Sequence, residues 1–168
     1  MAIRKGPRSQ ANRRAHVKAA YRSGLEKVIA AQIVEALGPD QLKYERYKVA
    51  FTQPAKERTY TPDFILPNGI VIESKGLFTS EDRQKTVWVM NQWPDLDLRF
   101  VFTNPKAKLY KGSKTTYADW CINNGIPFAK KPIPNEWLTE PVNTASQRAI
   151  LNAHLRAENR SKSKRKKK

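Results

Sequence analysis

The sequence predicts a mixed α/β (α+β) fold in which a mixed β-sheet is flanked by helices. Residues 61–76 have the pattern of a β-hairpin, with apolar strand residues on both sides of a Pro-Asn-Gly turn. A helical segment at 79–93 separates this hairpin from an apolar strand at 96–103, and this order implies a right-handed crossover between parallel strands. A capped helix at 23–37 precedes them. The 168 residues suffice for one domain with its own core.

The net charge of +17 is concentrated at the two ends of the chain. Residues 1–22 carry seven Lys or Arg and no acid, and residues 156–168 carry eight Lys or Arg and one acid, so the middle is close to neutral. We expect a basic arm at 1–21, a globular domain at 22–140 and a C-terminal extension at 141–168 with a Lys/Arg-rich tail. Such arms are typical of phosphate-contacting segments of nucleic-acid-binding proteins. A solubilising tail or a contact with a membrane surface is the alternative.

Other global features narrow the class of protein. No apolar run is long enough to span a membrane, and the N-terminus lacks the apolar core of a signal peptide, so we expect a cytoplasmic protein. The one cysteine, Cys121, is expected to be a buried structural thiol. His16 and His154 lie in the basic ends, which argues against Ser/His or Cys/His catalysis. The sequence has neither a zinc-type His/Cys cluster nor a Gly-rich phosphate loop.

The first helix begins at a capping box formed by Ser23 and Glu26, and Gly38 with Pro39 ends it. Glu26 has two interpretations at this point. It closes the capping box, or it is a carboxylate at the helix start that is available to a metal ion.

Alternating apolar residues predict a strand at 44–51, and the stretch at 52–58 after it is either an ordinary loop or an extended connector. Further along, Thr116 caps a short helix at 117–124, and residues 130–137 are expected to be irregular. We predict a short helix at 146–155 and disorder in the tail beyond it. A basic loop carries Lys106, Lys108, Lys111 and Lys114, which are either solvated or in contact with phosphates.

The central hairpin carries charges where a core-forming sheet should have none. If Leu66 lies across from Ile70, the register places Asp63 opposite Glu73, with Cβ atoms about 4.5–5.5 Å apart. Two carboxylates so close repel each other unless a cation lies between them or one is protonated. Lys75 follows two residues after Glu73 and so points to the same face. A slip of one residue in the turn would break this register.

This arrangement suits metal-dependent hydrolysis of phosphodiesters. Mg²⁺ prefers hard oxygen ligands and keeps several waters, so two carboxylates on adjacent strands meet its needs. Bound divalent cations activate water, stabilise phosphoryl charge and assist the leaving oxygen. Lys75 would position or deprotonate the water, or stabilise phosphoryl charge. Glu26 could share a second metal with Asp63. An exposed, charged hairpin face with no metal is the plainer alternative.

Several motifs together resemble the phage endonuclease I family of Holliday-junction resolvases. Pro62-Asp63 followed by Glu73-Ser74-Lys75 matches the PD-(D/E)xK signature of restriction-endonuclease-like nucleases. The longer matches are more specific, and they are Arg22-Ser23-Gly24-Leu25-Glu26, Tyr60-Thr61-Pro62-Asp63-Phe64, Leu66-Pro67-Asn68-Gly69-Ile70, Glu73-Ser74-Lys75-Gly76-Leu77 and Lys108-Leu109-Tyr110-Lys111-Gly112-Ser113. The resemblance covers roughly residues 20–140 and extends poorly to the Lys/Arg-rich end.

The resemblance implies a restriction-endonuclease-like nuclease domain at 22–140 with Glu26, Asp63, Glu73 and Lys75 as the catalytic set. Asp63, Glu73 and the Ser74 carbonyl would hold one Mg²⁺ or Mn²⁺, and Glu26 with Asp63 a second, so that each site holds two metals. The Ser74 side chain should matter little. The family further implies an intertwined, domain-swapped homodimer in which Glu26 comes from one subunit and the other three residues from its partner. The stretch at 52–58 is then a candidate bridge between the halves.

We therefore expect a structure-selective DNA endonuclease that resolves four-way junctions and other branched DNA by paired cuts, in the host cytoplasm if phage-encoded. The residues expected to contact DNA are the basic side chains of the N-terminal arm and of the 106–114 loop, namely Arg4, Lys5, Arg8, Arg13, Arg14, Lys18, Arg22, Lys108, Lys111 and Lys114. A non-catalytic nucleic-acid-binding protein, or a nuclease of the same fold that cuts linear duplex, are the alternatives.

Overall fold

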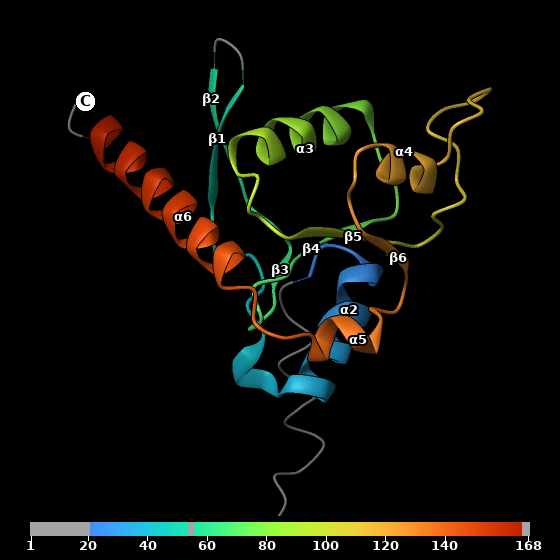
Figure 1. Ribbon diagram of the computed structural model, residues 1–168, viewed down its shortest axis with the longest axis horizontal. Helices are drawn as coiled ribbons and strands as arrows, with labels where there is room; N and C mark the ends of the chain where they lie inside the picture. The colour runs from blue at the N-terminus through green and yellow to red at the C-terminus, as the bar shows by residue number, and fades with distance from the viewer. Residues whose placement is uncertain (1–20, 54–55, 166–168) are drawn as a thin grey trace, which may run out of the picture.

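A computed structural model of the protein describes residues 21–53 and 56–165 (Figure 1). It is a mixed sheet of order β3-β4-β5-β6 with helices on both faces and a separate two-stranded hairpin, β1-β2. The elements in order are α2 (Gly24–Leu37), the short 3-10 helix η1 (Pro39–Gln41), β1 (Val49–Gln53), β2 (Lys56–Tyr60), β3 (Phe64–Ile65), β4 (Val71–Lys75), α3 (Ser80–Gln92), β5 (Leu98–Phe102), α4 (Tyr117–Asn123), β6 (Phe128–Lys130), α5 (Asn135–Thr139) and α6 (Thr144–Arg165). The predicted mixed sheet flanked by helices is confirmed.

The predicted register of the central hairpin is confirmed. Phe64 pairs with Ile72 and Ile65 with Val71, and the Leu66 amide donates to the Ile70 carbonyl at 2.8 Å. The turn closes through a 3.0 Å bond from the Gly69 amide to the Leu66 carbonyl. Gly69 has a φ of +90°, a conformation that residues with a Cβ rarely adopt, so the glycine is what allows this short turn.

The crossover predicted from the strand-helix-strand order is also present. β4 and β5 are parallel, with Lys75 beside Phe102, and α3 connects them. Both strands therefore end at the same edge of the sheet. α3 begins at a capping box in which Thr79 and Asp82 exchange side-chain and backbone hydrogen bonds.

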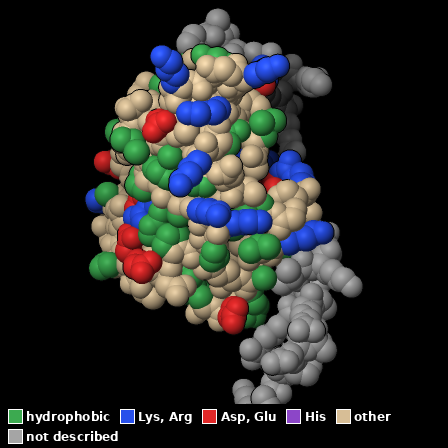
Figure 2. Space-filling view, turned by 90° about the vertical axis from the view of Figure 1, so that its right-hand side faces the viewer, with side chains coloured by type: hydrophobic (Ala, Val, Ile, Leu, Met, Phe, Trp, Pro, Cys, Tyr) green, Lys and Arg blue, Asp and Glu red, His purple; other side chains and the backbone are tan. Residues whose placement is uncertain are grey.

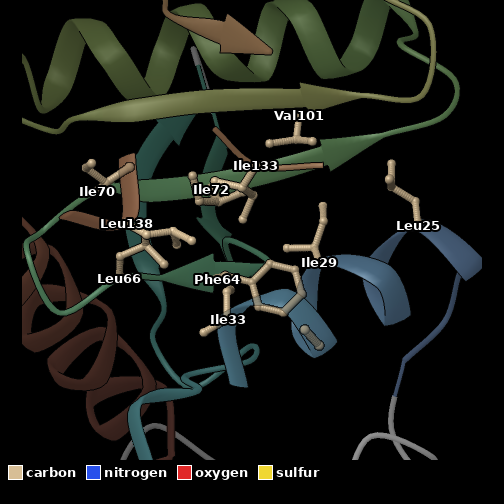
Figure 3. Close-up of a cluster of buried hydrophobic side chains, with 11 residues drawn as sticks. Leu25, Ile29, Ile33, Phe64, Leu66, Ile70, Ile72, Val101, Ile133 and Leu138 are labelled. Carbon is tan, nitrogen blue, oxygen red and sulfur yellow. The ribbon is translucent and has the colours of Figure 1, made fainter. Parts of the chain in front are cut away.

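Side chains of the parallel strands alternate between two faces, and each face has its own helices (Figure 1). On one face, Leu25, Ile29 and Ile33 of α2 pack against Phe64 and Ile72, as Figure 3 shows. On the other face, Phe100 and Phe102 of β5 pack with Tyr117 and Cys121 of α4, and Val71 packs with Val89 of α3. Cys121 is buried, as predicted, and burial raises the pKa of its thiol to about 12.

The strand predicted at 44–51 is wrong at its start. The structure has a single bridge between Tyr44 and Phe64, and the continuous strand begins only at Val49. Glu45 has a φ of +44°, which turns the backbone out of the extended conformation. Its amide donates to the Asp63 carbonyl at 3.0 Å instead of continuing a strand.

The stretch at 52–58 is neither an ordinary loop nor a single extended connector in this structure. β1 and β2 pair as an antiparallel hairpin from Val49 opposite Tyr60 to Gln53 opposite Lys56. The segment at 130–137, expected to be irregular, contributes the end of β6 and the start of α5.

The C-terminal helix is longer than predicted, because α6 continues through Arg165 instead of ending near residue 155. Its start is bonded to the central turn: Ser146 Oγ donates to the Gly69 carbonyl at 2.7 Å and accepts the Asp97 amide at 3.0 Å. Ala149, Ile150 and Ala153 then join the same core cluster as Val49 and Val71. The first half of the helix is thus an integral part of the fold. Among the helices of the described residues, none is long and apolar enough to cross a membrane.

Candidate active site

The candidate site lies at the edge of the sheet where β4 and β5 end. Alternation along β4 places Val71, Glu73 and Lys75 toward α3, and Ile72 and Ser74 toward α2. Glu73 is only 4% exposed, a degree of burial that carboxylates reach only when they are paired. The partners of the Glu73 carboxylate therefore explain how it can be buried here.

Both carboxylate oxygens of Glu73 have partners. The Tyr60 hydroxyl, at the end of β2, donates to Oε2 at 2.5 Å, and Lys75 Nζ lies 3.0 Å from Oε1. Burial and the nearby charge of Glu73 raise the pKa of Tyr60 well above its ordinary value, so the hydroxyl keeps its proton and acts as the donor. Because each carboxylate oxygen has two acceptor positions, these contacts leave capacity for a further ligand.

Lys75 is held between two acids. Its Nζ lies 3.0 Å from Glu73 Oε1 and 3.1 Å from Asp82 Oδ1, and Asp82 is in turn fixed by the Thr79 capping box. Burial lowers the pKa of Lys75, but the charges and hydrogen bonds of Glu73 and Asp82 outweigh it and raise the pKa above its usual range. The group is therefore an ammonium at neutral pH. This favours charge stabilisation over proton abstraction among the roles considered for it.

Asp63 lies beside β4 and bonds to the residue after Glu73. Its Oδ2 accepts the Ser74 amide at 2.8 Å and the Ser74 hydroxyl at 2.7 Å. Burial and the negative charge of Glu73 raise the pKa of Asp63 to about 6, although the two Ser74 bonds oppose this. The hydroxyl of Ser74 thus orients a carboxylate of the site, so the expectation that its side chain should matter little does not fit this contact.

Glu26 is engaged at the start of its own helix. Its Oε2 accepts the amides of Arg22 at 2.8 Å and Ser23 at 3.3 Å, and the Tyr44 hydroxyl at 2.8 Å. Burial raises the pKa of Glu26, but these hydrogen bonds outweigh it and hold the pKa below its ordinary value. The capping-box interpretation is confirmed within one chain, and Tyr44 is an additional partner that the sequence pattern did not show.

The structure brings Asp63, Glu73 and Lys75 together but does not add Glu26 to them. α2 packs on one face of the sheet, whereas Glu73 and Lys75 face α3 on the other. Among the residues that the structure describes, no group of three or more His, Cys, Asp or Glu side chains is close enough to hold a metal ion.

The donor chemistry of the Asp63–Glu73 pair nevertheless suits one hard divalent cation. The raised pKa of Asp63 reflects burial and negative charge that a cation would compensate. Mg²⁺ needs few protein carboxylates because it retains waters.

Two of the residues around the site were not indicated by the sequence. Tyr60 appeared only within the matched run Tyr60-Thr61-Pro62-Asp63-Phe64, and Asp82 only within the helical segment at 79–93. Neither contact leaves a sequence signal, because the packing of the β1-β2 hairpin beside β4 brings Tyr60 to Glu73, and the crossover places Asp82 beside Lys75.

The basic loop of residues 104–116 leaves the sheet at the carboxyl end of β5, beside the end of β4. Lys108, Lys111 and Lys114 are all exposed, and Lys108 Nζ donates to the Lys114 carbonyl at 2.6 Å, which closes the loop. Figure 2 shows Lys and Arg side chains distributed across the face that carries this loop and α4. The expected DNA-contacting residues Arg4, Lys5, Arg8, Arg13, Arg14 and Lys18 lie outside the described residues. Arg22 is exposed and forms an ion pair with Glu45.

Comparisons with known proteins all match this chain to phage endonucleases. The model of the phage endonuclease I family matches residues 8–157. An endonuclease I of Escherichia phage T7 is 50% identical over 122 residues, which are 73% of this chain and 80% of that protein. An endodeoxyribonuclease 1 of Enterobacteria phage T3 is 47% identical over 122 residues, which are 73% of this chain and 79% of that protein.

Proposed function

The chain belongs to the phage endonuclease I family and is an endodeoxyribonuclease, and on that premise we propose that it cuts branched DNA, four-way junctions above all, with divalent metal ions bound at the Asp63–Glu73 pair. The observation that carries this proposal is the buried carboxylate of Glu73 beside the half-buried Asp63 at a sheet edge, with an ammonium 3.0 Å from Glu73. This arrangement supplies hard ligands and a fixed positive charge in one place.

The residues of the chain have distinct parts in the proposed reaction. Asp63, Glu73 and the Ser74 carbonyl are the proposed ligands of Mg²⁺, for which Mn²⁺ can substitute. When bound, such a cation supplies Lewis-acid stabilisation and an activated water for phosphodiester hydrolysis. Lys75, kept protonated between Glu73 and Asp82, stabilises negative charge on the phosphoryl group. Tyr60 and Ser74 hold the two carboxylates in orientation.

We propose that Glu26 reaches this site from a partner subunit and shares a second metal with Asp63. The separation of Glu26 from Glu73 and Lys75 within one chain supports this, because a single chain does not assemble the three carboxylates. In the proposed intertwined homodimer, the 52–58 stretch is the candidate bridge between the two halves. Two sites fixed relative to each other would suit paired cuts across a junction.

Recognition is proposed to depend on DNA shape and backbone phosphates and not on base sequence. The exposed lysines of the 104–116 loop support this, since the loop begins at the sheet edge that carries the site. A protein that follows backbone geometry in this way distinguishes a branched substrate from its linear arms by the angle between duplexes.

Glu73→Gln provides the direct test, because it removes the charge and retains the shape. With Mg²⁺, the unaltered chain should cut a four-way junction faster than the matched linear arms, while Glu73→Gln should bind the junction but not cut it. The exposed Glu136→Gln is a matched control and should cut normally. Normal cutting by Glu73→Gln would refute the site. Equal cutting of the linear arms would favour a duplex nuclease, and no cutting by the unaltered chain would favour a binding protein.

The composite site has its own test. Glu26→Ala and Asp63→Ala chains, each inactive alone, should recover one working site when they are unfolded and refolded together. Refolded mixtures without activity would argue that each site is built from one chain.

A further inference from the structure

The distal half of α6 presents a row of hydrogen-bond donors that the site described above does not use. Asn152, Arg156, Asn159 and Ser163 follow one another at intervals of four, three and four residues, so they share one helix face. All four are exposed, and together with Glu57, Leu155 and Arg160 they line a shallow groove between α6 and the start of β2. We call this row the donor face. It extends for about 16 Å at the rise of an α-helix.

The donor face is held firmly to the body of the protein. Ala149, Ile150, Ala153 and Ala157 are buried along the neighbouring side of the helix. Farther along, Arg160 lies 3.0 Å from Glu57 and donates to the Phe51 carbonyl at 3.3 Å. Because this last anchor lies beyond Arg156 and Asn159, their positions are set by the fold, beside the β1-β2 hairpin (Figure 1).

The charge of this region is strongly positive. Residues 156–168 carry eight Lys or Arg and one acid, Glu158. Glu158 lies 3.9 Å from Lys162 and 3.7 Å from His154, and Glu57 is paired with Arg160, so both nearby acids have cationic partners. An anionic partner would therefore meet a positive field over a surface of amide, hydroxyl and guanidinium donors.

From these observations we propose that the donor face of α6 binds the phosphate backbone of a duplex arm. This inference rests on the proposed function. Arg, Asn and Ser donors are the groups that commonly contact DNA phosphates. One strand of a duplex presents a phosphate about every 3.4 Å of helix axis, so a 16 Å row of donors can follow several of them. The face lies on α6, apart from the 104–116 loop, and so gives the protein a second point of contact with an arm.

The test compares two variants with the same loss of charge, both in the Glu73→Gln background so that binding is measured without cleavage. Arg156→Gln/Lys162→Gln removes one charge of the donor face and one elsewhere on α6, and Lys130→Gln/Lys131→Gln removes two exposed charges at the end of β6. Affinity for a four-way junction and for a linear duplex is measured across a salt series. We expect the α6 variant to bind about tenfold more weakly near 0.15 M salt and its log–log salt slope to fall by about 1–2. The control should match the parent.

A second variant tests the face itself. Asn159→Asp places a carboxylate among the donors and should weaken binding more than Asn159→Ala does. The residues altered in addition to Glu73 are all exposed, so these variants should have the melting temperature of the Glu73→Gln parent. The melting temperature of each variant is measured together with its affinity.

The outcomes separate the inference from the function on which it rests. If the α6 variant binds like the parent, or if both charge variants lose affinity equally, the donor face is not a DNA surface. Parent-like DNA binding by the α6 variant would favour an acidic protein as the partner of this face. If the parent itself binds neither junction nor duplex, the proposed function fails, and this inference fails with it.

Discussion

Ser74 Oγ donates a 2.7 Å hydrogen bond to Oδ2 of Asp63, and the Ser74 amide donates a second bond of 2.8 Å to the same oxygen. One residue of β4 therefore orients the carboxylate of Asp63, which directly precedes β3. The side chain between Glu73 and Lys75 thus makes a contact of its own, in addition to the proposed use of its carbonyl.

Ser74→Ala should reduce cleavage about tenfold without abolishing it. Hydrogen bonds to charged groups contribute about 1.5–3 kcal/mol, and about 1.4 kcal/mol corresponds to a factor of ten in rate. The remaining amide bond limits the loss. Single-turnover cleavage of a junction measures the effect, and Ser74→Thr, which keeps a hydroxyl, should recover most of it. An unchanged rate in Ser74→Ala would show that the amide alone positions Asp63.

Tyr60→Phe should destabilise the metal-free protein by about 1–3 kcal/mol, because it leaves a buried carboxylate oxygen without its donor. Thermal or urea unfolding in the presence of a chelator measures this. Tyr110→Phe is a suitable control, since Tyr110 is 67% exposed. Mg²⁺ should reduce the difference between Tyr60→Phe and the parent, because a cation would compensate the charge of Glu73. If the difference in stability between Tyr60→Phe and the parent persists at saturating Mg²⁺, the substitution acts through packing and not through the charge of Glu73.

Asp63→Asn should stabilise the metal-free protein while abolishing cleavage. The folded protein holds the pKa of Asp63 at about 6, above the ordinary value of 3.8. Between these two pH values the folded state retains a proton that the unfolded state has lost, so the stability falls as the pH rises through this window. A shift of about two pKa units corresponds to a loss of about 3 kcal/mol at most at neutral pH.

The corresponding measurement is the free energy of unfolding from pH 4 to pH 8 in a chelator. The parent should lose stability from pH 4 to pH 6 relative to Asp63→Asn, and the exposed Asp95→Asn should follow the parent. Added Mg²⁺ should stabilise the parent and leave Asp63→Asn unchanged. Parallel pH profiles for the parent and Asp63→Asn would contradict the assignment of the raised pKa to this carboxyl.

Local sequence determined the hairpin and the helix start from which this site is built. The turn at Pro67, Asn68 and Gly69 determined the hairpin register, because only a short turn with one left-handed residue joins Leu66 to Ile70. The capping box at Ser23 marked the start of α2, since the side chains that satisfy free amides lie three residues apart. The same short-range rules indicated that Asp63, Glu73 and Lys75 would lie close together.

Tertiary structure decided which partners those residues meet. Tyr60 reaches Glu73 from another strand, and Asp82 reaches Lys75 across a crossover. The positive φ of Glu45 shortened a strand whose alternating pattern looked regular. Beyond residue 155, the basic composition predicted disorder, yet the ion pair of Arg160 with Glu57 holds the helix to the hairpin. Contacts between distant segments leave no periodic signal in either partner, so they could be known only once the chain was folded.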